Sequence, residues 1–285
     1  MESLQNEQQR EVLMGFFKTG LGEYGEGDEF LGLKVPQTRE VVKEVWKEVP
    51  LDEVPELLQS PWHEVRLCGL LILVAKFDAA AKKKQEQESK YIFIRDEILT
   101  MYLAHAEQAN NWDLVDLSAP KLLGKWIMLP TNLAEEADEI SYKRSVIDEL
   151  AHSTNLWRQR MSMVCTWETS HQGDPSWCLR YAEMHLKHPH DLMQKAVGWM
   201  LREMGKQVSM DLLRDFLQQH VSEMPRTTLR YAIEKMDEGE RRFWMKAKKI
   251  RPCKHDLINS LVNRQNTFIL IYLQLSPSPH RGRCP

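Results

Sequence analysis

The chain has 285 residues, of which 42% are hydrophobic and 28% charged, a composition typical of folded globular proteins that excludes wholesale disorder. Its formal net charge is −3, but residues 1–150 carry 17 basic and 28 acidic groups, whereas residues 151–285 carry 21 and 13. The C-terminal half is therefore a candidate for binding a polyanion, although solvated helix faces can also differ in sign by chance.

The sequence gives no sign of export or membrane insertion. Its first residues are polar and acidic, unlike a signal peptide, and it contains no run of 18 apolar residues, which excludes a membrane span. The five cysteines have no paired spacing, so we expect reduced thiols and a cytoplasmic protein.

Helix signals dominate the chain. Apolar residues recur three and four positions apart, and there is no convincing alternating stretch or hairpin turn, so the sequence predicts an all-α fold. Short breaks separate the periodic segments at residues 60–61, 110–111, 153–155, 188–190 and 224–225. Arg160, Lys195 and Arg230 follow three of these breaks at a spacing of 35 residues. A period near this length is typical of an α–α superhelix of HEAT-like repeats, a curved solenoid with a concave groove.

The segment after the break at 110–111 places Trp112 and Asp116 one turn apart on one helix face. Asp113 lies near the helix start, where its charge suits the helix dipole. Asp116 lies deeper, between Val115 and Leu117. An aspartate in such surroundings must be paired, hydrogen-bonded or functional, and the pattern alone does not decide among these.

Arg160 shares its side of the next helix with Trp157, Met161 and Val164. We therefore expect a partly buried guanidinium, which needs a carboxylate or a phosphate as partner. A structural ion pair and a ligand contact are equally compatible with this pattern.

The helix predicted over residues 191–206 has a core stripe that includes Val197 and Met200. Trp199 lies on the opposite side, together with Lys195, Arg202 and Lys206. A lone tryptophan is more often buried, but helical phase here places it among cations, where it suits a nucleic-acid backbone or an electron-poor ring.

The following helix continues this basic strip. Arg226 and Arg230 lie outside its apolar face, and Pro225 suits its first helical position. Taken alone, two such arginines are ordinary solvated side chains. Beside the preceding helix, they favour a continuous cationic surface.

Metal and cofactor chemistry have little support. His185, His188 and His190 invite a metal site, but Pro189 breaks their helical spacing and no cysteine or acidic ligand completes the set. The chain lacks the glycine-rich nucleotide motifs, the serine-hydrolase elbow and the HExxH motif, so we expect no metal and no cofactor.

Six segments together resemble a known family. They are FLGLKVPQTR (30–39), WHEVRLCGLLILVAKF (62–77), NNWDLVDLSAPKLLG (110–124), LWRQRMSMV (156–164), HDLMQKAVGWMLREMGK (190–206) and MPRTTLRYAIEKM (224–236). They closely resemble the AlkD-like group of DNA alkylation repair enzymes. The resemblance implies a HEAT-like domain over residues 1–249, with residues 250–285 as a non-matching extension that we expect to be disordered at its end.

The resemblance also implies an activity. It points to a monofunctional DNA glycosylase, a monomer that removes N3- and N7-alkylated purines from double-stranded DNA and lies with the nucleoid when bound. Carried over by residue, the catalytic aspartate is Asp116, the groove tryptophans are Trp112 and Trp199, and the phosphate-contacting arginine is Arg160. Lys195, Arg202, Arg230 and Arg226 are expected to add phosphate contacts.

An alkylated cationic purine is already a good leaving group, so one ionised carboxylate near the sugar suffices to stabilise positive charge and to orient water. Residues 22–33 depart from the family pattern, and Tyr24 is a candidate substitute for a groove aromatic residue. The alternatives are a non-catalytic HEAT-like scaffold for damaged or branched DNA and a protein-interaction solenoid. A carboxylate in the groove would repel DNA in a mere scaffold, and this favours the enzyme.

Overall fold

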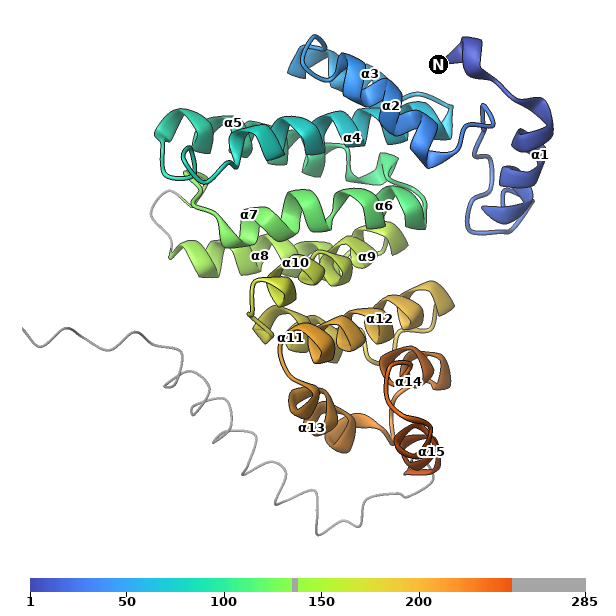
Figure 1. The fold of residues 1–285 in the computed structure, drawn as a ribbon, viewed down its shortest axis with the longest axis vertical. Helices are drawn as coiled ribbons and strands as arrows, with labels where there is room; N and C mark the ends of the chain where they lie inside the picture. The colour runs from blue at the N-terminus through green and yellow to red at the C-terminus, as the bar shows by residue number, and fades with distance from the viewer. Residues whose placement is uncertain (135–137, 248–285) are drawn as a thin grey trace, which may run out of the picture.

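The computed structural model describes residues 1–134 and 138–247, and these residues form helices joined by loops, of which the longest spans residues 17–34 (Figure 1). The only pairing of β type among them is an isolated bridge between Glu29 and Trp62, so the all-α prediction is confirmed. None of the described helices is both long enough and apolar enough to cross a membrane.

The first half of the chain contains α1 (Glu7–Phe16), α2 (Val35–Val45), α3 (Val54–Leu58), α4 (His63–Ala80), α5 (Ser89–Ala104), α6 (Trp112–Ser118) and α7 (Lys125–Met128). The second half contains α8 (Glu139–His152), α9 (Leu156–Val164), α10 (Thr166–His171), α11 (Ser176–Met184), α12 (Asp191–Gln207), α13 (Met210–His220), α14 (Arg226–Ala232) and α15 (Glu238–Ala247). The predicted helix 191–206 is thus α12, one residue longer than expected.

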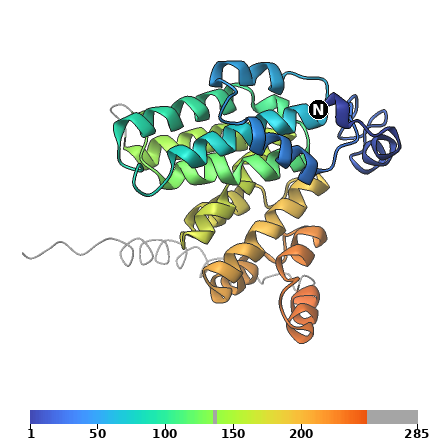
Figure 2. The same cartoon turned by 45° about the horizontal axis from the view of Figure 1, so that its top comes forward.

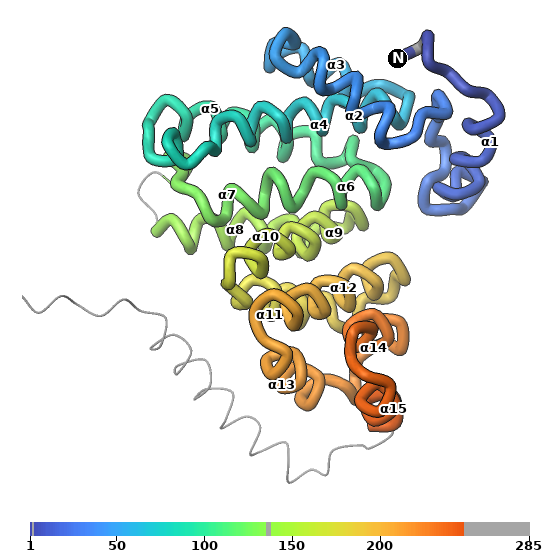
Figure 3. Tube along the Cα trace, in the orientation of Figure 1, coloured from blue at the N-terminus to red at the C-terminus, as the bar shows by residue number. Residues whose placement is uncertain are grey.

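The helices stack in sequence order along the long axis, from α2–α5 at one end to α13–α15 at the other (Figure 1). Helix α4 packs against α2, α3, α5 and α6, and α12 packs against α9 before it and α14 after it. Figure 2 shows the same succession from another side, and the tube in Figure 3 traces α1 and the loop after it along one edge of the stack. This order is consistent with an α–α superhelical repeat fold, whereas the curved solenoid with a basic concave groove stays a prediction.

Three of the sequence breaks, at residues 110–111, 153–155 and 188–190, act as helix starts because they carry N-capping side chains. Asn111 accepts a hydrogen bond from the Trp112 amide at the start of α6, and Asn155 accepts two at the start of α9. His190 caps α12 by accepting from the Leu192 amide. Each cap satisfies an amide that the helix leaves unpaired, and an asparagine cap contributes about 1 kcal/mol. The caps therefore fix where the three helices that carry the candidate site begin.

Two glycines allow the close packing of the helices around the site. A Cβ atom on Gly198 would lie 2.4 Å from the Thr228 carbonyl oxygen, so α12 and α14 touch through their backbones. A Cβ atom on Gly124 would lie 2.5 Å from the Cys165 carbonyl oxygen. Gly124 ends a π-helical turn, Pro120–Gly124, that joins α6 to α7, and such turns are frequent near functional sites.

The hydrophobic core runs through the stack, and its largest fully buried side chains include Phe77, Tyr102 and Trp126. The buried face of α12, with Val197, Met200 and others, is the core stripe that the sequence predicted. The expected extension 250–285 lies outside the described residues, and the division of the chain at residue 249 stays a prediction.

Candidate active site

Two neighbouring cavities lie where α1 faces α6, α9 and α12. The first has a volume of about 580 Å³ and contains Asp116 in a largely apolar wall. The second, of about 530 Å³, is lined by Tyr24, Arg160, Lys195, Arg202 and Tyr231. Phe16, Trp112 and Trp199 line both cavities. One cavity thus offers apolar surface beside a carboxylate, and its neighbour offers cations.

Asp116 and Arg160 form a two-pronged ion pair across the α6–α9 boundary. The Arg160 Nε and Nη2 atoms donate to Oδ1 and Oδ2 of Asp116, both at 2.8 Å. The Arg160 Nη1 atom donates to the Leu192 carbonyl oxygen at 2.6 Å, which adds α12 to the contact. The side chain of Arg160 is 6% exposed and that of Asp116 15%, so the carboxylate keeps an open edge toward the cavity. Paired charges at this depth hold one another in a fixed geometry.

Burial and pairing act in opposite directions on this carboxyl group. Burial raises the pKa of Asp116 above its usual range, whereas the Arg160 guanidinium offsets part of that rise. Of the readings that the sequence left open for these two residues, the structure shows the ion pair. A phosphate contact by Arg160 stays a prediction.

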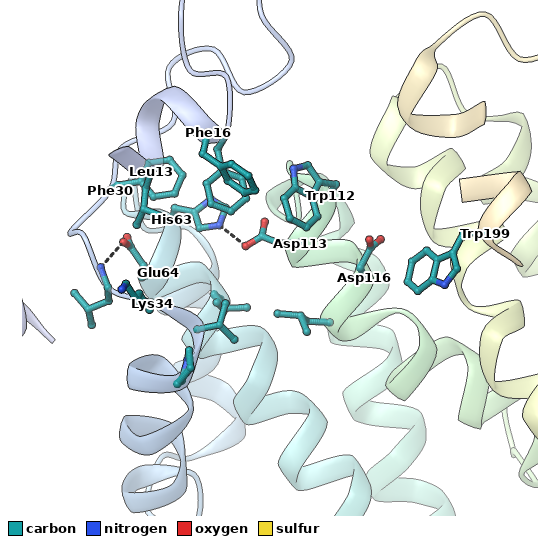
Figure 4. A pocket seen from close by; sticks show the side chains of 16 residues that line it. Leu13, Phe16, Phe30, Lys34, His63, Glu64, Trp112, Asp113, Asp116 and Trp199 are labelled. Carbon is teal, nitrogen blue, oxygen red and sulfur yellow. Dashed lines mark hydrogen bonds and ion pairs between the residues drawn. The ribbon is translucent and has the colours of Figure 1, made fainter. Parts of the chain in front are cut away.

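Trp112 and Trp199 stand on either side of Asp116 (Figure 4). Trp112 stacks on Phe17 with a centroid distance of 5.3 Å and meets the exposed Phe16 edge-on at 5.8 Å. Trp199 is partly buried and leaves α12 on the side opposite its core stripe, as helical phase indicates. The carboxylate therefore lies between two electron-rich ring systems.

The cations predicted from helical phase divide into two groups. Lys195 and Arg202 line the second cavity, but each has an acidic partner. Lys195 pairs with Asp191 at 2.6 Å, and Arg202 pairs with Glu203 and Glu234. These three acids were not predicted as partners, although Asp191 and Glu203 lie within a turn of their cations and Glu234 follows the end of α14.

Arg226 and Arg230 lie on α14, next to α12, and line neither cavity. Arg226 donates to the Met245 carbonyl oxygen at 3.2 Å. Arg230 is exposed, and it forms no ion pair with any residue of the described parts of the chain. Among the cations of the predicted strip, Arg230 is therefore the one with the fewest contacts inside the protein that would compete with a phosphate.

A buried charged cluster that the sequence analysis missed lies behind Trp112. The His63 Nδ1 atom lies 2.7 Å from Asp28 Oδ2, and its Nε2 atom lies 2.9 Å from Asp113 Oδ2. Arg66 also contacts Asp28 and donates to Asn110 Oδ1. Burial disfavours a charged imidazole, but the two carboxylates outweigh it and raise the pKa of His63 to about 9. In the sequence, this cluster is indicated only by His63 and Glu64, which lie next to each other at the start of a mostly apolar helix.

Glu64 shapes the opposite wall of the first cavity. Its carboxylate accepts hydrogen bonds from the amides of Leu31, Gly32 and Leu33 at 2.8, 2.9 and 3.0 Å. Gly32 has a φ of +88°, a conformation that other residues rarely adopt. These contacts hold the loop before α2 against α4. The proposed substitute Tyr24 lines the second cavity and meets Trp157 edge-on at 6.1 Å.

The three histidines of the HLKHPH segment are engaged with protein groups. His185 contacts the Ser162 hydroxyl, His188 contacts the Gln159 amide oxygen, and His190 caps α12. Burial lowers the pKa of His185 to about 4, so this ring is neutral at physiological pH. In residues 1–134 and 138–247, no three side chains of metal-ligating type form a group that could hold a metal ion.

The comparisons with known proteins agree with this fold. The family model of the DNA alkylation repair enzymes matches residues 1–236, so the chain belongs to this family. The fold is similar to that of a solved structure, a predicted DNA alkylation repair enzyme from Enterococcus faecalis. The TM-score is 0.59 at 13% identity, over 82% of this chain and 97% of that one. A comparison with curated proteins finds no match. The family places the protein among the enzymes of DNA repair, with DNA as its partner.

Proposed function

We propose that the protein is a monofunctional DNA glycosylase that excises N3- and N7-alkylated purines from double-stranded DNA, acting as a monomer and without a cofactor. The observation that carries the proposal is the Asp116 carboxylate, fixed by Arg160 and open to a cavity between Trp112 and Trp199. Membership of the family indicates that the protein acts on DNA. The carboxylate site suits a reaction that removes alkylated bases.

Alkylation at N3 of adenine or N7 of guanine gives the base a positive charge. When the bond from C1′ to the base breaks, the electron pair goes to the base, which leaves neutral, and the positive charge moves to the sugar. A carboxylate next to C1′ stabilises that charge more strongly in the transition state than in the substrate. In this proposal Asp116 takes that place, orients the attacking water and accepts its proton.

The site has little means of protonating a neutral base. Both ring nitrogens of His63 are held by carboxylates, and Glu64 is occupied by three backbone amides. Both oxygens of Asp116 accept hydrogen bonds from the Arg160 guanidinium. These engaged groups fit a substrate that already carries its charge, which is the property that N3- and N7-alkylation confers.

The surrounding residues take complementary parts. Trp112 and Trp199 offer ring faces to the cationic sugar and base and keep the site poor in water. Lys195 and Arg202 would exchange Asp191 and Glu234 for DNA phosphates, whereas Arg230, which forms no ion pair within the described residues, would bind one directly. Arg160 and Arg226 are the further candidates for phosphate contacts. Such contacts make affinity depend steeply on salt.

Base release from methylated duplex DNA tests the proposal. The purified protein is incubated with the DNA, and the soluble fraction is separated by chromatography. We expect 3-methyladenine or 7-methylguanine in the soluble fraction. Tight binding to the same DNA without release of any base would contradict the glycosylase and would identify a lesion-binding scaffold.

A further inference from the structure

We propose that His63 is a positioning residue that holds Trp112 in place for excision, through Asp113 on one side and the Phe17 ring on the other. The inference rests on the proposed function and deepens it. His63 lies at the start of α4, and its side chain is 2% exposed, so it does not itself reach the DNA.

The first connection from His63 to Trp112 runs through the backbone of α6. His63 Nε2 lies 2.9 Å from Asp113 Oδ2, and Asp113 follows Trp112 directly in the first turn of that helix. The other carboxylate oxygen, Oδ1, is buried and has no hydrogen-bond partner within the described residues. Within the described residues, His63 is thus the group that donates a hydrogen bond to the Asp113 side chain. A buried carboxylate without any donor destabilises the folded state.

The second connection runs through stacked rings. The His63 ring stacks on Phe30 at a centroid distance of 4.4 Å and meets Phe17 at 5.0 Å. Phe17 in turn stacks on Trp112 at 5.3 Å, with an interplanar angle of 27°. A shift of the imidazole therefore reaches Trp112 through these rings as well as through α6. Figure 4 shows His63 beside Asp113, with Trp112 beyond them.

The charges around His63 explain why its protonation state matters. It faces Asp28 from the loop before α2 and Asp113 from α6, while Arg66 on its own helix also binds Asp28. The Glu64 carboxylate accepts hydrogen bonds from backbone amides. Lys34 and Asp116 also line the first cavity. Only the imidazolium can donate to both aspartates, since a neutral ring has one N–H. Loss of the proton leaves a nitrogen lone pair facing a carboxylate oxygen.

The free protein offers a readout that does not depend on excision. The fluorescence of Trp112 is obtained as the difference between the protein and its Trp112→Phe variant, and this difference is followed from neutral to alkaline pH. We expect a transition near the pKa of His63, which is raised to about 9. The transition should be absent in His63→Asn and shifted to lower pH in Asp113→Asn, because that variant removes one of the carboxylates that favour the charged ring.

Excision provides the second readout. His63→Asn should bind DNA like the unaltered protein but excise up to about 100-fold more slowly, the loss associated with misplacement by about 1 Å. Asp96→Asn is the matched control, because Asp96 is a buried aspartate that holds the loop at Thr131 and Asn132, away from both cavities. It should excise at the unaltered rate.

Three results would overturn the inference. One is an alkaline Trp112 transition that persists in His63→Asn, and another is normal excision by that variant. If His63→Asn does not fold, an unshifted transition in Asp113→Asn overturns it. Failure of the proposed function gives a different pattern, in which the fluorescence transition behaves as expected but the unaltered protein releases no base.

Discussion

Replacing Asp116 by asparagine isolates the charge of the carboxylate from its shape. In the structure both oxygens accept from Arg160 at 2.8 Å, and the carboxylate edge opens to the cavity. The asparagine side chain would keep one acceptor and turn an amide N–H₂ toward a guanidinium donor. Loss of one preorganised electrostatic contact to the transition state costs about 3–4 kcal/mol, so we expect Asp116→Asn to excise about 100- to 1,000-fold more slowly.

The substitution also affects folding, because it leaves the Arg160 guanidinium buried without its counter-charge. Removing one partner of a buried pair costs up to about 3–5 kcal/mol, so the folded fraction must be measured by thermal denaturation. Asp148→Asn is the control for losing the carboxylate of a forked pair, although that pair is more exposed. Asp148 accepts from Arg180 Nε and Nη2 at 3.2 and 2.6 Å in a similar fork, but it lines neither cavity.

Single-turnover excision of 7-methylguanine from a defined duplex, with enzyme in excess, compares the two variants. We expect Asp148→Asn to excise at the unaltered rate and Asp116→Asn to retain DNA binding. Excision by folded Asp116→Asn at the unaltered rate would refute the assignment of the carboxylate. An equal loss in both variants would show that the effect is one of stability.

Further predictions concern pH and salt. Burial raises the pKa of Asp116, and the carboxylate is its reactive form. The rate of single-turnover excision should therefore begin to fall at a higher pH than the titration of an ordinary aspartate would give. A rate that does not change as the pH is lowered would contradict this. His63, with a pKa of about 9, should stabilise the fold fully below pH 6.5 and lose that contribution, on the order of 3 kcal/mol, as pH rises through 9; urea unfolding at neutral and alkaline pH measures it, and equal stabilities would disprove it. Arg230→Gln should reduce the salt slope of DNA binding by about 1, and an unchanged slope would exclude a phosphate contact.

The sequence predicted α12 well because a 17-residue amphipathic helix repeats its pattern over several turns. Helical phase also separates Trp199 from the core stripe, and the structure leaves Trp199 only partly buried. The partner of Arg160 could not be predicted, because Asp116 lies 44 residues earlier and only the packing of α6 on α9 brings the two together. The requirement for a partner was readable from the sequence, but the identity of the partner was not.

The N-terminal wall of the site could not be predicted from the sequence for another reason. Residues 17–34 form loops held by long-range contacts, such as Glu64 with the backbone of residues 31–33 and His63 with Asp28. Helical periodicity carries no information about such segments. The buried Phe17, which lines the first cavity and stacks on Trp112, is therefore found only in the structure.

The central claim is that this site removes purines that already carry a positive charge. The most direct test compares the excision rates of 7-methylguanine and hypoxanthine in otherwise identical duplexes, because hypoxanthine is a neutral purine that must gain a proton to leave easily. The site described here should release 7-methylguanine and leave hypoxanthine in place. Release of both at similar rates would require a general acid that the engaged groups of these cavities do not supply, and would contradict the account.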